Sequence, residues 1–241
     1  MLSCLIKIKK YQLKSYLRTN LNFMLKAVLF DMDGVIVDTE PLHQRAYMNM
    51  FDKVGIRVSK EQYNRFTGQS TLAICKQLCN HYNLRQHADE LVKIKRDNFT
   101  KLFFEDNTLE LINGVETLIK EYHQHGLALV LASSASMFTI KNITKRFNLD
   151  RFFLNKLSGA DLRASKPHPE IFLKAAKAAQ VLPSECLVIE DSTNGIMAAN
   201  RAGIFCVAYK NENSVNQDYK LADKLISDYS EISYEKVKNL V

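Results

Sequence analysis

The chain has 241 residues, enough to bury one large core or two small ones, and is 46% hydrophobic and 24% charged, as globular proteins are. Most of the net charge of +7 falls on residues 1–23, which carry +5, so the remainder carries only +2. A nearly neutral body argues against a nucleic-acid partner. No apolar run approaches the ~20 residues of a membrane span, which argues against a membrane partner.

Residues 1–23, here called the leader, contribute no core pattern. Their charge comes from five basic residues without any acid: Lys7, Lys9, Lys10, Lys14 and Arg18. Three interpretations are open: a targeting peptide, a basic surface-binding helix, or translated sequence ahead of a functional start at Met24. We favour the third, and expect a chain that starts at Met24 to fold and turn over normally.

The first predicted strand, residues 27–30, is followed by two aspartates. The strand is apolar without interruption, as expected where both faces are buried, and Asp31 and Asp33 come directly after it. Two carboxylates this close resist joint ionisation unless a cation or a proton intervenes. At the carboxyl end of a strand they could act as a nucleophile and a proton carrier; a plain Asp-x-Asp-Gly turn is the alternative.

After this strand the pattern is helical only, from residue 41 to residue 106. Apolar residues recur at helical spacing through most of the stretch, and no strand candidate interrupts it. Because the stretch leaves the strand at the end that carries Asp31 and Asp33, we expect it to lie over the site as a cap.

From residue 107 onward, helices and strands alternate, which predicts a parallel sheet with helices on both faces. Strands are expected at 127–132, 152–157, 186–190 and 204–209, and helices at 115–126, 137–147, 169–179, 194–202 and 230–240, the last one capped by Ser230. We therefore predict an α/β fold, a Rossmann-like doubly wound parallel sheet with an inserted all-helical cap domain. Residues 24–40 and 107–241 would form the core and residues 41–106 the cap.

More polar residues fall where predicted strands end. Ser133 follows one strand, Glu190 and Asp191 end another, and Lys166 precedes a helix. Taken singly, each has a simpler explanation: Ser133 could cap a helix, Lys166 could be a solvated surface lysine, and Asp191 could start a turn. Parallel strands, however, bring their carboxyl ends to one edge of a sheet, so we expect these side chains to converge there with Asp31.

In order and spacing, four segments resemble the motifs of the haloacid dehalogenase-like (HAD) phosphohydrolase superfamily. They are residues 30–35, 131–133, 165–167 and 189–192, and the resemblance covers residues 26 to about 210. Within the superfamily the chain looks most like the subgroup of sugar-phosphate phosphatases and β-phosphoglucomutase, because residues 38–43 and 192–196 match it as well.

The resemblance implies a catalytic role for both aspartates. Asp31 would attack phosphorus and form an aspartyl-phosphate, and Asp33 would protonate the leaving oxygen and then deprotonate the attacking water. Ser133 and Lys166 would hold the phosphoryl oxygens, whose negative charge such catalysis has to stabilise.

The resemblance also implies a Mg²⁺ site. Asp31, the backbone carbonyl of Asp33, and Asp191 would hold the ion, with Glu190 ordering its water shell. The cation would at the same time resolve the repulsion between the two neighbouring aspartates.

The cap would select the substrate. By resemblance, Thr39 and His43 lie at the hinge, and Gly68 and Ser70 lie on a cap loop that faces the site. His43 could equally be a partly buried polar helix residue.

This loop departs from the mutases of the family, which have a lysine and an arginine in it, the arginine binding a second phosphate. The present chain has Thr67 and Thr71 at the corresponding places. Losing both cations argues for hydrolysis, although the long side chain of the neighbouring Arg65 could reach into the site.

We therefore predict a Mg²⁺-dependent, HAD-like phosphoric monoester hydrolase for a small phosphorylated metabolite, in the first place a sugar phosphate. The alternatives are a phosphosugar mutase of the β-phosphoglucomutase type and a non-catalytic phosphate-binding or partner-binding protein. A dehalogenase is disfavoured, because Asp33 would have no use there. We expect a cytoplasmic monomer or weak dimer.

The five cysteines agree with a cytoplasmic location. Their number is odd and there is no C-x-x-C motif, which favours reduced, structural thiols. Metal binding by Cys75 and Cys79 is the alternative, but no second ligand pair accompanies them.

Overall fold

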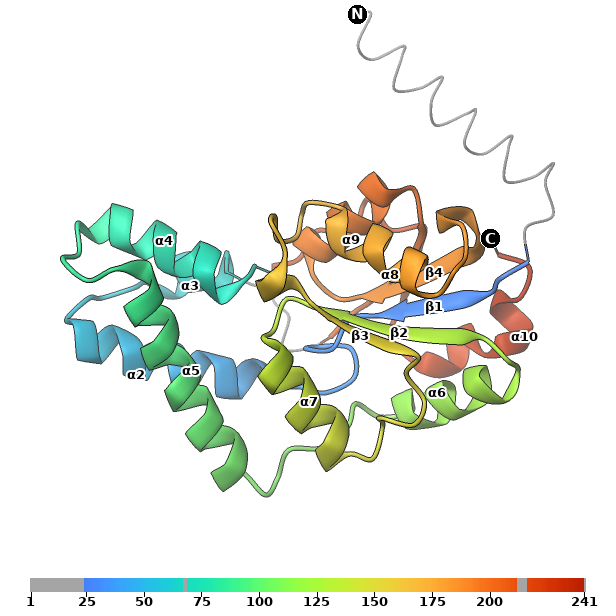
Figure 1. The fold of residues 1–241 in the computed structure, drawn as a ribbon, viewed down its shortest axis with the longest axis horizontal. Coiled ribbons are helices and arrows are strands. Elements are labelled where there is room, and N and C mark those ends of the chain that lie inside the picture. The colour runs from blue at the N-terminus through green and yellow to red at the C-terminus, as the bar shows by residue number, and fades with distance from the viewer. Residues whose placement is uncertain (1–23, 67–68, 212–215, 241) are drawn as a thin grey trace, which may run out of the picture.

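A single parallel sheet organises the chain. The computed structural model describes residues 24–66, 69–211 and 216–240, so the leader, Thr67 and Gly68 lie outside the described residues. The strand order is β3-β2-β1-β4-β5-β6, with every neighbouring pair parallel (Figure 1). The strands are β1 (Ala27–Phe30), β2 (Ala128–Ser133), β3 (Asn155–Ser158), β4 (Cys186–Glu190), β5 (Phe205–Tyr209) and β6 (Lys224–Ile226).

Helices cover both faces of this sheet, which confirms the predicted doubly wound fold. Ala27 and Leu29 pack with α8 and α9 on one face, while Val28 and Phe30 pack with α6, α7 and α10 on the other (Figure 1). Among the described residues, no helix is both long enough and apolar enough to cross a bilayer. The helices are α2 (Glu40–Val54), α3 (Lys60–Asn64), α4 (Thr71–Tyr82), α5 (Ala88–Glu105), α6 (Val115–Gln124), α7 (Met137–Arg146), α8 (Glu170–Ala178), α9 (Thr193–Ala202) and α10 (Tyr234–Val237).

The helices α2 to α5, here called the cap helices, lie beyond the carboxyl ends of the strands (Figure 1). No strand occurs among the described residues between 41 and 106, as predicted. Tyr47, Phe51 and Leu78 belong to an apolar cluster of the cap helices themselves, whereas Leu42 and Phe99 pack with the sheet. Because α2 and α5 contribute to both clusters, the predicted borders of a separate cap domain stay a prediction.

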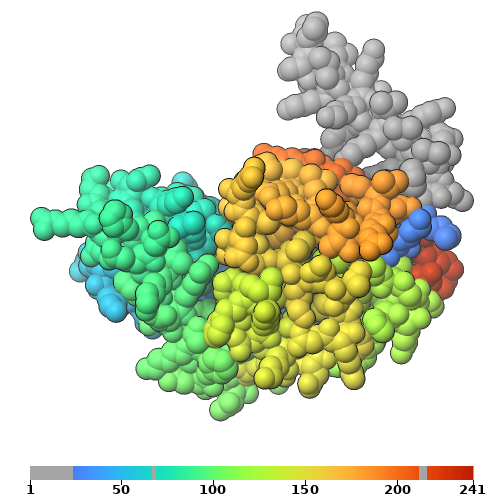
Figure 2. All heavy atoms as spheres, viewed as in Figure 1, coloured from blue at the N-terminus to red at the C-terminus, as the bar shows by residue number. Residues whose placement is uncertain are grey.

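The cap helices are tied to the sheet beside α7, where their side chains meet in the space-filling view (Figure 2). The guanidinium of Arg146 donates to the backbone carbonyls of Phe103, at 2.9 Å, and Asp106, at 2.6 Å. These bonds hold the C-terminal end of α5, the last cap helix, against the core.

The C-terminal segment differs from the prediction of one helix capped by Ser230. A 3₁₀ turn, η3 (Tyr229–Ile232), precedes the short α10, and it is Asp228 that caps this turn, by accepting the backbone N–H of Ser230 at 2.7 Å. The reason is tertiary packing: Tyr229 and Ile232 are buried in the core, and Ser233 between the two elements is extended. The edge strand β6 was also not predicted, because three residues are too few to show a period.

Candidate active site

The strand register brings the predicted polar residues to one edge of the sheet. Phe30 pairs with Leu131 of β2 and with Ile189 of β4, so Asp31 emerges between the ends of these two strands. Its backbone N–H donates to the carbonyl of Ile189 at 3.0 Å, which continues the ladder by one residue. The side chains at the carboxyl ends of β1, β2 and β4 are therefore brought close together.

Lys166 lies at the centre of this cluster. Its side chain is 1% exposed, and its ammonium donates to the carboxylate of Asp31 and, at 2.6 Å, to Oε1 of Glu190. Burial disfavours the charge on Lys166, but the two carboxylates outweigh it and raise its pKa. Burial likewise raises the pKa of Asp31 to about 8, while the Lys166 charge opposes this. The alternative of a solvated surface lysine is therefore wrong.

The carboxylate of Glu190 is hydrogen-bonded within the turn between β4 and α9. Its Oε2 accepts the backbone N–H groups of Asp191 and Ser192, both at 2.9 Å, and the Ser192 hydroxyl at 3.0 Å. A Cβ on Gly195 would lie 1.7 Å from Oε1 of Glu190, so glycine alone leaves room for this carboxylate. Glu190 thus orients both Lys166 and the loop that carries Asp191.

The cluster has the composition of a hard-cation site. Asp31, Glu190 and Asp191 each offer a carboxylate oxygen, and these atoms all lie within 4.8 Å of one another. Gly34 has φ +80°, and a Cβ there would lie 2.2 Å from Oδ2 of Asp191, so the glycine lets this carboxylate approach the loop of Asp33. The three carboxylates outnumber the single ammonium of Lys166. This surplus of negative oxygen ligands fits a divalent cation such as Mg²⁺.

Asp33 is held by residues of the predicted hinge. The hydroxyl of Thr39 donates to Oδ1 of Asp33, and Nε2 of His43 lies 3.4 Å from the same oxygen. Burial favours the neutral form of Asp33, but the hydrogen bonds from His43 and Thr39 and the charge of Lys95 outweigh it and lower its pKa. Two predicted cap residues therefore contact Asp33 in the loop after β1.

Ser133 ends β2 and is fully buried. Its hydroxyl lies 3.4 Å from Oδ2 of Asp33 and accepts the backbone N–H of Ala135 at 3.0 Å. The alternative role as a helix cap falls to Ser136, which accepts the N–H of Thr139 at the start of α7. The cavity next to the cluster is lined by Ser134 and Ala135, which the sequence did not single out.

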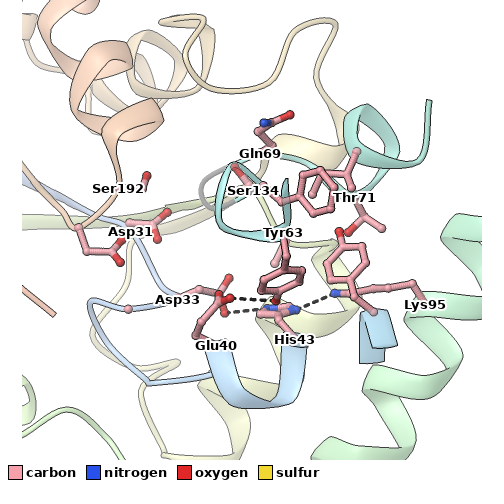
Figure 3. A pocket seen from close by; sticks show the side chains of 16 residues that line it. Asp31, Asp33, Glu40, His43, Tyr63, Gln69, Thr71, Lys95, Ser134 and Ser192 are labelled. Atoms are coloured by element: carbon pink, nitrogen blue, oxygen red, sulfur yellow. Dashed lines mark hydrogen bonds and ion pairs between the residues drawn. The ribbon is translucent and has the colours of Figure 1, made fainter. Parts of the chain in front are cut away.

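A cavity of about 80 Å³ lies between the carboxylates and the cap helices (Figure 3). Of the predicted cap residues, His43 lines it, and Gly68 lies outside the described residues. Ser70 is buried as the N-cap of α4, where it accepts the N–H of Ala73 at 3.3 Å, and it does not line the cavity. Gln69 and Thr71 of the predicted cap loop line it as well, whereas three other polar lining residues were not predicted: Glu40, Tyr63 and Lys95.

Lys95 of α5 is a buried cation, only 3% exposed. Its Nζ lies 2.6 Å from Nδ1 of His43 and 4.9 Å from the ring centroids of both Tyr47 and Phe99. Because an ammonium can only donate, Nδ1 of His43 accepts, and the ring N–H is left on Nε2, which faces Asp33. Lys95, His43 and Asp33 therefore form one polar chain (Figure 3).

The sequence did contain a signal for Lys95. Leu91, Lys95 and Phe99 are spaced four residues apart and lie on one helix face, whose other members are apolar and buried. A lysine in the middle of an apolar stripe is rarely buried without a partner, so it marks a candidate for a polar contact.

Replacing Lys95 by Met is expected to raise the pKa of His43. Burial lowers this pKa first, and the charge of Lys95 adds to the effect, so removing the charge makes protonation easier. An NMR titration of the His43 imidazole below pH 8, where Lys95 with a pKa of about 8 is charged, measures the shift. Lys93→Met is the matched control, because Lys93 is exposed on the same helix and pairs with Asp97 at 2.8 Å. An unchanged or lower pKa in Lys95→Met would contradict the polar chain.

Comparison with known proteins identifies the family. The family described as haloacid dehalogenase-like hydrolase matches residues 28–209. A putative phosphatase, YhcW of Bacillus subtilis, is 31% identical over 190 residues, which cover 78% of this chain and 85% of that protein. A phosphorylated carbohydrates phosphatase of Thermotoga maritima is 28% identical over 180 residues, 75% of this chain and 82% of the relative.

Solved structures agree with this assignment. The crystal structure of β-phosphoglucomutase from Clostridium difficile superimposes with a TM-score of 0.79 at 26% identity, covering 89% of this chain and 96% of the other. The matched residues 28–209 include all but the first residue of β1, the whole of β2 and β4, and Lys166, so they contain the whole acidic cluster. The chain therefore belongs to the haloacid dehalogenase-like hydrolases.

Proposed function

We propose that the protein is a Mg²⁺-dependent phosphatase that hydrolyses the monophosphate ester of a small sugar or polyol through an aspartyl-phosphate on Asp31. The observation that carries this proposal is that Asp31, in contact with Lys166, lines one small cavity together with Asp33. The phosphatase names of the two relatives support the predicted class, a phosphoric monoester hydrolase.

In the first step a carboxylate oxygen of Asp31 attacks phosphorus, and the bond from phosphorus to the leaving oxygen breaks. Asp33 gives its proton to that oxygen. The pKa of Asp33 is lowered without substrate, but the dianionic phosphate of a bound substrate raises it again, because a like charge favours the neutral form. Substrate binding itself would thus bring Asp33 toward its acid form.

In the second step Asp33, now a carboxylate, takes a proton from water. The water oxygen attacks phosphorus, the bond to Asp31 breaks, and inorganic phosphate leaves. The hydroxyl of Thr39 and the ring of His43 hold Asp33 in place for both proton transfers.

Asp31, Asp191 and the backbone carbonyl of Asp33 would hold Mg²⁺, which supplies positive charge beside the transferred phosphoryl group. Both oxygens of Glu190 already have partners in the protein, which suits a place around the ion rather than on it. Lys166 contributes the second positive charge, and Ser133 a hydroxyl at the end of β2.

The described cap residues favour hydrolysis over the mutase alternative. Arg65 pairs with Glu61 at 2.8 Å, with side chains 75% and 82% exposed, and lines a separate hollow with Thr193. Among the described residues that line the active-site cavity, the one lysine or arginine from the cap is Lys95. Its ammonium is already bound to His43. Thr71 lines the cavity as a neutral donor, which holds a phosphate less strongly than a cation does.

An NMR assay of β-glucose 1-phosphate with a trace of the 1,6-bisphosphate tests the reaction type. We expect inorganic phosphate to be released from hexose and pentose monophosphates in the presence of Mg²⁺, and little interconversion of glucose 1- and 6-phosphates. Arg65→Ala is expected to behave like the wild type. Rapid formation of glucose 6-phosphate without phosphate release, lost in Arg65→Ala, would overturn the hydrolase and identify Arg65 as the missing clamp.

A further inference from the structure

Glu40 and Tyr63 form a polar pair on the cap side of the cavity. The phenol of Tyr63 donates to Oε1 of Glu40 at 2.9 Å, and both residues line the cavity (Figure 3). Glu40 opens α2 directly after Thr39, and Tyr63 comes from α3, so the contact joins two cap helices at the hinge. Neither residue belongs to the acidic cluster or to the chain from Lys95 to Asp33.

A purely structural role explains the phenol of Tyr63 and Oε1 of Glu40, but not Oε2 of Glu40. Tyr63 is 5% exposed, and a buried phenol needs a hydrogen-bond partner, which Oε1 of Glu40 supplies. Tyr63 reaches only that one oxygen, and none of the other described residues donates a hydrogen bond to Oε2 of Glu40. Oε2 of Glu40 is therefore left as an acceptor on the cavity wall for a donor that enters the cavity.

The surroundings narrow the chemistry of that partner. The aromatic rings of Tyr47 and Phe66 and the side chain of Ile74 form the adjoining wall, and each of these residues is at most 6% exposed. Burial raises the pKa of Glu40 to about 7, so above pH 7 the group is a carboxylate whose Oε2 accepts a hydrogen bond. A second phosphate on the substrate would be repelled by this carboxylate, whereas an alcohol could donate a hydrogen bond to it.

We infer that Oε2 of Glu40, oriented by Tyr63, accepts a hydrogen bond from a hydroxyl on the carbon chain of the substrate. The pair then distinguishes hydroxylated phosphate esters, such as sugar and polyol monophosphates, from esters without a hydroxyl. This inference rests on the proposed phosphatase function, and it makes Glu40 and Tyr63 specificity-determining residues of the same site.

The test is the ratio of kcat/KM for glucose 6-phosphate to kcat/KM for p-nitrophenyl phosphate, which has no alcohol. Loss of one hydrogen bond that only the sugar makes is expected to lower this ratio about tenfold in Glu40→Ala. Tyr63→Phe removes one oxygen atom and leaves the carboxyl unoriented, so its ratio is expected to fall about threefold. The second variant keeps the test valid if Glu40→Ala folds poorly.

Two matched controls come from the cap helices. Tyr82→Phe removes a phenol that also donates at 2.9 Å within the cap, to Oε1 of Gln62, but does not line the cavity. Glu61→Ala removes an exposed carboxyl of α3 that pairs with Arg65. Both controls are expected to keep the wild-type ratio.

The outcomes separate the two proposals. An unchanged ratio in Glu40→Ala and Tyr63→Phe, or equal losses for both substrates, would overturn the hydroxyl contact while leaving the phosphatase in place. If the wild type cleaves p-nitrophenyl phosphate but no sugar or polyol phosphate, the proposed substrate class fails, and the inference with it. A fall of the ratio in the two cap variants and not in the controls supports it.

Discussion

Asp31→Asn is expected to lower phosphate release by about 10⁴-fold or more, to the background rate. The amide keeps the shape of the carboxylate but lacks the charge and the attacking oxygen lone pair that form the bond to phosphorus. Release of inorganic phosphate from glucose 6-phosphate in the presence of Mg²⁺ measures the effect. Asp97→Asn is the matched control, since Asp97 is exposed on α5 and pairs only with Lys93 among the described salt bridges.

The same variant is expected to be at least as stable as the wild type when no divalent cation is present. Asp31 shares a buried site with Glu190 and Asp191, and Lys166 is the cation in contact with it. Above the Asp31 pKa of about 8, the substitution removes one negative charge and relieves like-charge repulsion, while Lys166 keeps its 2.6 Å contact with Glu190. Thermal unfolding in EDTA checks this. Turnover near the wild-type rate would show that Asp31 is not the nucleophile, and a much lower Tm would show that its charge stabilises the fold.

The residues that sequence analysis located are those whose position follows from strand ends. An unbroken apolar run predicts a buried strand, and parallel pairing places the residue after each strand at one edge, so Asp31, Ser133 and Glu190 were bound to converge. Lys166 sits in a loop and has no such constraint. Its motif, rather than its spacing, predicted its place beside Asp31.

The residues that sequence analysis missed are held in place by contacts between helices. Tyr63 meets Glu40 across 23 positions, and Lys95 meets His43 across 52. Helical periodicity predicts which face of each helix is apolar, but the way in which α2, α3 and α5 cross decides which polar residues meet at the edge of that face. A single sequence carries no information on these crossings. The same reason explains Ser70, whose motif position resembles a substrate contact but whose side chain caps α4.

In the C-terminal segment, too, long-range contacts that the sequence pattern does not reveal determine the structure. Local capping signals suggested one helix, yet the hydroxyl of Tyr229 donates to the carbonyl of Val35, at 2.5 Å, and the ring stacks on Tyr209. These contacts with the loop that follows Asp33 determine the backbone more strongly than local helix propensity does. The site loop is thereby supported by residues nearly two hundred positions away, which no local pattern could show.

Lys166→Met is expected to lower the free energy of unfolding by about 4 kcal/mol in EDTA, because removing one partner of a buried ion pair leaves the other charge uncompensated. Two carboxylates are affected here, Asp31 and Glu190, and both contacts are almost fully buried. Urea unfolding measures the loss. Lys174→Met is the matched control: it breaks a half-exposed i,i+4 pair with Glu170 on α8, and such pairs contribute under about 1 kcal/mol.

The double variant Asp31→Asn/Lys166→Met separates the charge from the packing of the lysine stem. Above the Asp31 pKa of about 8 it removes one charge of each sign, so it is expected to recover most of the stability that Lys166→Met loses there, while phosphate release stays at background. Adding Mg²⁺ is expected to stabilise Lys166→Met more than the wild type, because the cation supplies the positive charge that the acidic cluster lacks. If Lys166→Met were as stable as the wild type in EDTA, the ammonium would not be what holds the carboxylates of Asp31 and Glu190 together.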